Sequence, residues 1–329
     1  MVIRRKATLN YSHEIMVNKK TNKKNNFFKY VKRNYGLYML LIPGFIFLLI
    51  FHYVPLYGIV LAFKDFNMFS GNSPFMSIVS SPWVGLKVFK EVFSRPDFYM
   101  VFSNTLIISI YKLIFLFPLP IILAILLNEV NNRVYKKNVQ TVIYLPHFLS
   151  WTIVSGIFFN LLGTTGIANQ FLKAVGIPEI SFLMDPNIFR SVIIFTAGWK
   201  NMGWSSIVYL AAITSIDQEQ YEAAKIDGAN KFQQIKNITL PGMVPIIIML
   251  LILQLGSLMD AGFEQIFVMY NPTVYDVSDI IGTYVYRMGL GKMNFSLGTA
   301  IGLFNSVISF TLIYSANSLC KRFLGKSIW

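Results

Sequence analysis

Residues 222–241 read EAAKIDGANKFQQIKNITLP, a polar and charged stretch between two long apolar runs. The runs on either side cover residues 191–213 and 243–261. A handful of turn residues is enough to join two helices in a bundle. A connection of about twenty residues therefore indicates a segment with a structure and a task of its own.

Apolar runs divide the rest of the chain. There are six, at residues 38–62, 102–127, 141–162, 191–213, 243–261 and 297–319. About 20 apolar residues in a helix cross the roughly 30 Å hydrocarbon core of a bilayer. Of the 329 residues, 54% are hydrophobic and 13% are charged, whereas soluble domains are about 25% charged. The sequence predicts an all-α polytopic membrane protein with six transmembrane helices, in which the opening stretch joins helices four and five.

The net charge of +14 is concentrated at the N-terminus, where ten of the 29 Lys and Arg residues precede residue 36. Basic residues that flank membrane segments report orientation first, so nucleic acid is not an expected partner. We expect residues 1–36 to be a basic, disordered cytoplasmic tail, followed by a retained first helix and not by a cleaved signal peptide. The six-helix domain is expected over residues 37–320, with a short cytoplasmic tail at 321–329.

The distribution of Lys and Arg among the connections favours both termini on the cytoplasmic side of the membrane. The connection at residues 216–241, which carries three lysines, then lies in the cytoplasm. The connections on the opposite side, at residues 63–101, 163–190 and 268–296, are long. We expect short interfacial helices in them and a surface that faces an external partner.

The sequence lacks the residues or the spacing that several kinds of site require. Cys320 is the single cysteine, so no disulfide forms within the chain. His13, His52 and His147 lack metal-ligand spacing, so no metal site is expected. No GxxxxGK[ST] phosphate-binding loop occurs, and ATP, if it drives this protein, binds to another chain. No nucleophile or acid–base pair is placed where the predicted helices would bring catalytic groups together, so an enzyme is not expected.

Local signals give the connection at residues 216–241 a defined shape. Asp217, with Gln220 three residues later, predicts the start of a helix over QEQYEAAKI. Gly228 suits a left-handed turn, and a second short helix is expected over KFQQIKNI. Pro241 is expected to open helix five, where a missing N–H costs nothing. The segment is thus a compact elbow that serves as a docking site or lies as an amphipathic helix among lipid headgroups.

The spacing of the elbow resembles a family signature. The matching pattern is Glu222-Ala223-Ala224, three residues, Gly228, nine residues, Ile238, one residue, Leu240-Pro241. It is similar to the EAA loop in permease subunits of type I binding-protein-dependent ABC importers, carbohydrate-uptake branch. The stretches QTVIYLPHFLSW (140–151) and GFEQIFVMYNPTVYDVSDIIGTYVYRMGL (262–290) resemble the complex-oligosaccharide permeases related to those for maltose and alginate.

The resemblance implies a permease subunit in the bacterial inner or plasma membrane, forming half of the pore of an ATP-driven oligosaccharide importer. The implied partners are a second homologous permease, two copies of an ATPase that hold ATP and Mg, and an extracytoplasmic substrate-binding protein. This chain itself is expected to bind no cofactor. In that family the elbow seats in a groove of the ATPase, so the implied coupling residues are Glu222, Ala223, Ala224, Asp227, Gly228, Ala229, Ile238, Leu240 and Pro241. The alternative is a self-contained secondary transporter of a polar solute, which would show inverted repeats and several interior carboxylates.

Sugars are held by aromatic faces and by hydrogen-bonding side chains, and charges within a membrane mark functional or pairing sites. Asp260 and Glu264 are four residues apart and share one face of any helix that continues that far, with Lys200 as a candidate partner. Trp and Tyr residues also anchor helices at the membrane interface, and amides also join helices. The substrate-pathway candidates are Trp151, Asn160, Trp199, Lys200, Asn201, Trp204, Tyr209, Gln254, Asp260 and Glu264.

Two glycines and one histidine are expected to have structural roles in helix packing and no direct role in transport. Gly298 and Gly302 are four residues apart in the sixth run and form a close-packing face, within this chain or against the second permease. His147 is expected to be a structural histidine and not a proton relay.

Overall fold

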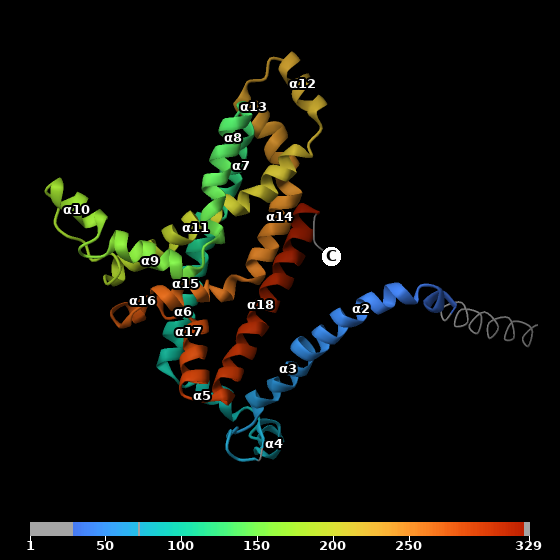
Figure 1. The fold of residues 1–329 in the computed structure, drawn as a ribbon, viewed down its shortest axis with the longest axis vertical. Coiled ribbons are helices and arrows are strands. Elements are labelled where there is room, and N and C mark those ends of the chain that lie inside the picture. The colour runs from blue at the N-terminus through green and yellow to red at the C-terminus, as the bar shows by residue number, and fades with distance from the viewer. Residues whose placement is uncertain (1–28, 72, 326–329) are drawn as a thin grey trace, which may run out of the picture. The chain divides into compact units, whose positions relative to one another are not determined.

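The computed structural model describes residues 29–71 and 73–325, in two compact units, Met1–Val60 and Leu61–Trp329. Residues 1–28 and 326–329 of the two predicted tails therefore lie outside the described residues. The expectation of a disordered tail is wrong for residues 29–33, which are helical, and the last helix continues to Leu324, into the predicted C-terminal tail. Within the described part the chain is helical, and strand-like pairing is limited to one isolated antiparallel bridge between Lys64 and Trp83. Figure 1 shows the helices as separately labelled elements.

The first unit is a run of consecutive helical segments. These are α2 (Tyr35–Leu48), the π-helical η1 (Leu49–Tyr53), α3 (Val54–Leu56) and the 3-10 helix η2 (Tyr57–Phe63), which continues into the second unit. None of the residues described in the first unit is buried within the chain. Apolar side chains around the whole circumference suit a helix whose surroundings are hydrocarbon.

The second unit contains the remaining helices. Its first half consists of α4 (Pro74–Ser80), α5 (Lys87–Phe93), α6 (Pro96–Leu116), α7 (Pro118–Glu129), α8 (Arg133–Tyr144), η3 (Leu145–Phe148), α9 (Trp151–Leu162), α10 (Ile167–Ala174) and α11 (Pro186–Thr214). Its second half consists of α12 (Gln218–Ile226), α13 (Lys231–Gln234), η4 (Ile235–Thr239), α14 (Leu240–Gly256), η5 (Leu258–Asp260), α15 (Phe263–Met269), η6 (Pro272–Val274), α16 (Tyr275–Ser278), α17 (Ile281–Val285), η7 (Tyr286–Gly291) and α18 (Phe295–Leu324). The three connections predicted to be long do contain short helices, among them α4, α10 and α17.

Five helices in the described part are long and apolar enough to cross a membrane. They are Tyr35–Phe63, Pro96–Glu129, Trp151–Ala174, Lys231–Gly256 and Phe295–Arg322. Each overlaps one of the predicted apolar runs. The remaining run, 191–213, lies inside α11, which is long but does not belong to this set. An all-helical, multi-pass membrane protein is confirmed, while the number of six spans stays a prediction.

The prediction of one helix over residues 141–162 is wrong. α8 ends at Tyr144, a 3-10 turn follows, and Leu149 has an extended backbone. A new helix, α9, begins after Ser150, whose hydroxyl accepts a hydrogen bond from the Ile153 amide at 3.3 Å. Pro146 has no N–H with which to continue the hydrogen-bond ladder of α8, so an apolar run there does not remain one helix.

α11 is the central helix of the second unit. It packs along α7 and also contacts α6, α8 and α14. Near its start, Ile193 belongs to a buried cluster with side chains of α9 and α15. Near its end, Ile213 belongs to another buried cluster with side chains of α7 and α14. α14 in turn lies beside α18, as Figure 1 shows.

Glycines allow two helix pairs to approach closely. At Gly203 of α11, a Cβ atom would lie 2.0 Å from the Ile143 carbonyl oxygen of α8. At Gly298 of α18, a Cβ atom would lie 3.0 Å from the Cα of Gly289. Gly302 meets nothing within 4 Å, so the predicted close-packing face is formed within this chain at Gly298 but not at Gly302.

The crossing of α8 and α11 generates a stability prediction. Gly203→Ala places a methyl group on a backbone carbonyl, and the overpacking should cost about 1–3 kcal/mol. We expect a lower midpoint of thermal unfolding in detergent. Gly156→Ala is the matched control, because a Cβ on Gly156 meets nothing within 4 Å and alanine is the better helix former. Equal midpoints for the two variants would show that the crossing is looser than described.

Candidate functional site

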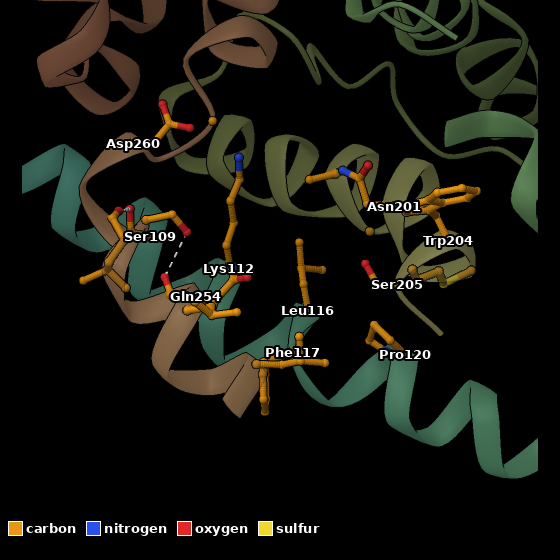
Figure 2. Close-up of a pocket in the computed structure, with 18 of the residues that line it drawn as sticks. Ser109, Lys112, Leu116, Phe117, Pro120, Asn201, Trp204, Ser205, Gln254 and Asp260 are labelled. Atoms are coloured by element: carbon orange, nitrogen blue, oxygen red, sulfur yellow. Dashed lines mark hydrogen bonds between the residues drawn. The ribbon is translucent and has the colours of Figure 1, made fainter. Parts of the chain in front are cut away.

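The second unit contains an open pocket of about 630 Å³ among its central helices. The wall is formed by α6, α7, the start of α9, α11, α14 and the segment that joins α14 to α15. Figure 2 shows side chains from these helices converging on one space.

Six of the ten predicted pathway residues line this pocket. They are Trp151, Asn201, Trp204, Tyr209, Gln254 and Asp260. The structure therefore brings together residues that are more than a hundred positions apart in sequence. Aromatic side chains and amides line the same pocket, and this is a combination that suits the binding of a sugar.

The other four candidates do not line the pocket. The Asn160 amide donates to the Gly156 carbonyl of its own helix at 2.9 Å. The Trp199 ring packs edge-on against Phe158, with 5.4 Å between the centroids. Glu264 is exposed near the start of α15, and Lys200 is buried behind the wall.

No helix continues through both Asp260 and Glu264, so the shared helix face that the sequence allowed does not form. α14 ends at Gly256, and Asp260 belongs to the separate 3-10 turn η5. Ala261 and Gly262 then follow with φ of 51° and 84°, both in the left-handed region. A left-handed pair cannot continue a right-handed helix, so α15 begins anew with a different direction.

Lys200 binds carbonyl oxygens and not a carboxylate. Its Nζ donates to the His147 carbonyl at 2.7 Å and to the Leu149 carbonyl at 2.6 Å. It also lies 5.5 Å from the centre of the Trp151 ring. Among the described residues it forms no ion pair with either predicted carboxylate. The helix interruption between α8 and α9 leaves these carbonyls without helical partners, and the lysine satisfies them.

His147 belongs to the aromatic wall. Its ring stacks on Trp204, with 4.7 Å between the centroids and an interplanar angle of 1°. Its Nδ1 lies 3.2 Å from the Asn201 side-chain oxygen. These contacts support the expectation of a structural histidine, because the ring is held on both its face and its edge. They also fix the orientation of two pocket-lining side chains.

Lys112 is a pocket residue that the sequence analysis missed. Its Nζ donates to the Gln265 side-chain oxygen at 2.7 Å and to the Ala261 carbonyl at 2.9 Å. Gln265 is fully buried and donates onward to the Ile193 carbonyl at 2.6 Å and to the Thr196 hydroxyl at 2.7 Å. A lysine in the middle of an apolar run was the available signal, because charges within a membrane are rarely without a role.

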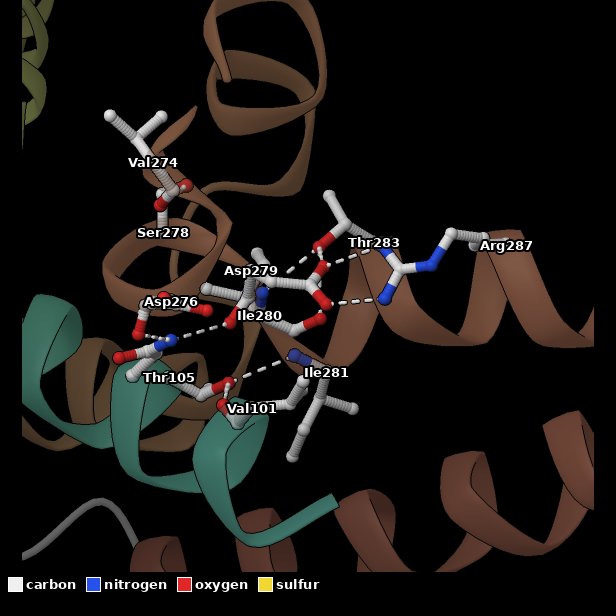
Figure 3. A network of polar contacts seen from close by, with 11 residues as sticks. Val101, Thr105, Val274, Asp276, Ser278, Asp279, Ile280, Ile281, Thr283 and Arg287 are labelled. Carbon is white, nitrogen blue, oxygen red and sulfur yellow. Dashed lines mark hydrogen bonds and ion pairs between the residues drawn. The ribbon is translucent and has the colours of Figure 1, made fainter. Parts of the chain in front are cut away.

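Figure 3 shows a second polar cluster, and none of the residues labelled there lines the pocket. Asp279 is buried and pairs with Arg287 through contacts of 2.5 and 3.1 Å. Asn104 of α6 donates to the carbonyls of Asp276 and Asp279, and it accepts from Arg190 at 2.7 Å. The Asp279 carboxylate and the Asn104 amide oxygen both have partners, and the cluster joins α6 and α11 to the segment before α17.

The nine predicted coupling residues lie in the elbow, residues 216–241. Figure 1 shows α12 at one end of the second unit, beyond α13 and the adjoining ends of α7 and α8. Asp217 caps α12, which spans the predicted helix, and Gly228 has the expected positive φ of 80°. Glu222, Ala223 and Asp227 are exposed, whereas Ala224, Ala229 and Ile238 are partly buried.

Pro241 lies in the first turn of the α-helical segment α14, as expected, but α14 does not begin a separate helix. Residues Lys231–Gly256 form one continuous helix, and Pro241 follows its π-helical segment η4. A proline removes the hydrogen bond to the residue four positions earlier, and a π-helical turn next to it accommodates the missing donor. Pro55 likewise follows a π-helical segment, η1, by two residues.

The carbonyl contacts of Lys200 generate the second prediction. Lys200→Met should leave two part-buried carbonyls without a donor, and hydrogen bonds to a charged group contribute about 1.5–3 kcal/mol each. We expect a clear fall in the thermal unfolding midpoint in detergent. Lys173→Met removes an exposed lysine and should leave the midpoint unchanged. A fall of the same size in both variants would contradict the assigned role of Lys200.

Comparison with known proteins identifies a family. Residues 116–324 match the family described as binding-protein-dependent transport system inner membrane component. The chain is 46% identical to Protein LplB of Bacillus subtilis (strain 168), over 89% of this chain and 91% of that protein. It is 42% identical to the polygalacturonan/rhamnogalacturonan transport system permease protein YteP of the same organism, over 96% of this chain and 97% of that protein.

Solved structures agree with these relatives. The chain resembles one chain in the crystal structure of a bacterial ABC transporter involved in the import of the acidic polysaccharide alginate, with a TM-score of 0.83 and 40% identity. The match covers 91% of this chain and 99% of that chain, and it is the same for the alginate transporter in complex with an alginate pentasaccharide-bound periplasmic protein. The chain therefore belongs to the binding-protein-dependent transport system inner membrane components, transport proteins and not enzymes, and groups among them with the permeases of carbohydrate ABC importers.

Proposed function

We propose that this chain is the permease subunit through which an ATP-driven importer moves an oligosaccharide across the membrane. The observation that carries the proposal is the pocket, where Trp151 and Trp204 lie near Asn201, Gln254 and Asp260 inside a bundle of apolar helices. Its volume of about 630 Å³ falls within the roughly 300–1,000 Å³ of small-molecule sites. The aromatic faces would receive the C–H faces of sugar rings, and the amides and carboxylate would bind their hydroxyls.

The proposed assembly contains further chains. This chain forms half of the pathway beside a second, homologous permease, and an external substrate-binding protein delivers the sugar. The similar alginate transporter, which was solved in complex with a pentasaccharide-bound periplasmic protein, supports the substrate-binding protein as a partner. Two copies of a cytoplasmic ATPase complete the proposed assembly. ATP and Mg bind to them and not to this chain, whose sequence has no phosphate-binding loop.

We place both termini and the elbow on the cytoplasmic side of the bacterial inner or plasma membrane. The Lys and Arg distribution supports this orientation. The exposed side chains of Ile226 and Phe232, 88% and 72% accessible, support a partner at the elbow. That partner is the ATPase, which would contact the nine coupling residues described above.

Lys112 supports an acidic oligosaccharide as the substrate class. An ammonium group has three N–H donors, and among the described residues two of them have acceptors. The third would reach a carboxylate in the pocket in competition with Asp260, whose charge acts on the same ammonium group. Two similar proteins are named for polygalacturonan and for the acidic polysaccharide alginate, which supports the same class. Asp260 on the same wall would accept hydrogen bonds from sugar hydroxyls.

The substrate class is tested with Lys112→Met in the complex of all cognate subunits. Hydrogen bonds to a charged group contribute about 1.5–3 kcal/mol, and about 1.4 kcal/mol is tenfold in affinity. We expect uptake of tetragalacturonate to fall at least tenfold more than uptake of its methyl ester, which has the same length without the charge. Lys112→Arg should retain the preference for the acid. Equal losses for both sugars would show that Lys112 only stabilises the helix interruption.

The coupling role is tested with Glu222→Lys in the same complex. Reversing an exposed charge on the surface that meets the ATPase should abolish substrate-stimulated ATP hydrolysis and ATP-dependent uptake. Lys321→Glu reverses an exposed charge on the same side of the membrane but outside the elbow, and it should have no effect. Intact stimulation in Glu222→Lys would make the coupling assignment wrong. Uptake driven by an ion gradient without ATP would favour the secondary transporter instead.

A further inference from the structure

α12 is attached to the rest of the protein at few points. None of its residues is buried, and Ile226 near its end is almost fully accessible. Among the described residues, a single side-chain hydrogen bond joins α12 to another element, between the Tyr221 hydroxyl and the Thr239 hydroxyl at 2.9 Å. The two residues are separated by 18 positions, so this bond closes the elbow on itself.

The first attachment point of α12 is the turn at its C-terminus. The Ala229 amide donates to the Ala224 carbonyl at 2.8 Å, and the Gly228 amide donates to the Lys225 carbonyl at 3.1 Å. This pattern around a left-handed glycine is a Schellman motif. The Gln234 side chain then donates to the Ala229 carbonyl at 3.0 Å, which ties the turn to the next helix.

Tyr221 provides the second attachment point, away from the turn. Its partner Thr239 is only 3% exposed and lies in the π-helical segment η4. The Thr239 hydroxyl also donates to the Gln234 carbonyl at 3.5 Å, which leaves its oxygen to accept from Tyr221. A helix held only by its two chain connections, at Asp217 and at Gly228, could rotate about the line that joins them, whereas this hydrogen bond holds α12 at a fixed angle to the following helix.

We infer that the Tyr221–Thr239 hydrogen bond is a positioning contact that makes α12 and the Lys231–Gly256 helix move as one body. The inference rests on the proposed function, in which the ATPase displaces the elbow. Tyr221 lies beside the proposed coupling residues but touches neither nucleotide nor substrate in this scheme. Its contribution is to convert a displacement of α12 into a rotation of α14, and α14 carries the pocket residues Leu250, Leu253 and Gln254.

The test removes the hydroxyl groups one at a time in the full reconstituted complex. Tyr221→Phe and Thr239→Val should each lower the ratio of sugar transported to ATP hydrolysed at least threefold, while the ATPase still copurifies in the normal amount. The double variant should be no lower than either single variant, because both remove the same bond. Thr239→Ser keeps a hydroxyl and should retain the wild-type ratio.

A second measurement separates positioning from folding. Because Cys320 is the single cysteine, a Cys320→Ser chain can carry spin labels at Lys225→Cys on α12 and Lys137→Cys on α8. We expect a narrow distance distribution that broadens when Tyr221→Phe is added. The thermal unfolding midpoint should stay the same.

An unchanged transport ratio in Tyr221→Phe, with Glu222→Lys still inactive, would overturn this inference and leave the proposed function standing. An unbroadened distance distribution, or fully additive losses in the double variant, would also overturn it. A wild-type complex that hydrolyses no ATP in response to substrate would overturn both the inference and the function on which it rests.

Discussion

The bundle depends on two lysines that bind backbone carbonyls where helices are interrupted. Hydrocarbon offers no hydrogen-bond donor, so irregular backbone inside a membrane protein must be satisfied by the protein itself. Lys200 does this for the carbonyls of His147 and Leu149, between α8 and α9. Lys112 does it for the carbonyl of Ala261, between α14 and α15. In each case a buried charge and an unpaired carbonyl, both costly alone, stabilise each other.

The pocket exists because of these two interruptions. Continuous apolar helices would pack against one another and leave no polar surface between them. Where α14 stops, Asp260, Ala261 and Gly262 turn toward the pocket, and where α9 starts, Trp151 does the same. The lysines thus have two consequences, since the contacts that stabilise the irregular backbone also determine which polar groups face the pocket.

Local signals predict the parts of this protein that local contacts stabilise. The cap at Asp217 and the left-handed Gly228 bound α12 at the residues expected from the sequence. The apolar runs locate five long helices because composition alone determines whether a helix suits hydrocarbon. The continuous helix through Pro241 was not predicted, because a π-helical turn has no sequence signature of comparable strength.

Hydrogen-bond partners that are far apart in the sequence could not be predicted. Lys200 stood out as a charge in an apolar run, but its carbonyl acceptors lie more than fifty residues earlier, in a helix interruption that the composition of that run conceals. The Lys112 side chain meets Gln265 at a separation of 153 residues. The left-handed Ala261 was also unpredictable, because a residue with a Cβ adopts that conformation only when surrounding contacts impose it.

One helix links the two regions that the proposed transport cycle requires. Residues Lys231–Gly256 run without a break from the elbow to the pocket. At 1.5 Å per residue, Thr239 and Gln254 are about 22 Å apart along it. Moving a two-state equilibrium from 1:99 to 99:1 takes about 5.5 kcal/mol of differential binding. Such a free energy reaches the pocket only if the helix is held at both ends, at Thr239 by the elbow and past Gly256 by Lys112 on Ala261. The proposed transmission of force from the elbow to the pocket therefore requires three features together. They are the structured elbow, the interrupted helix after Gly256 and the polar side chain that holds the interruption.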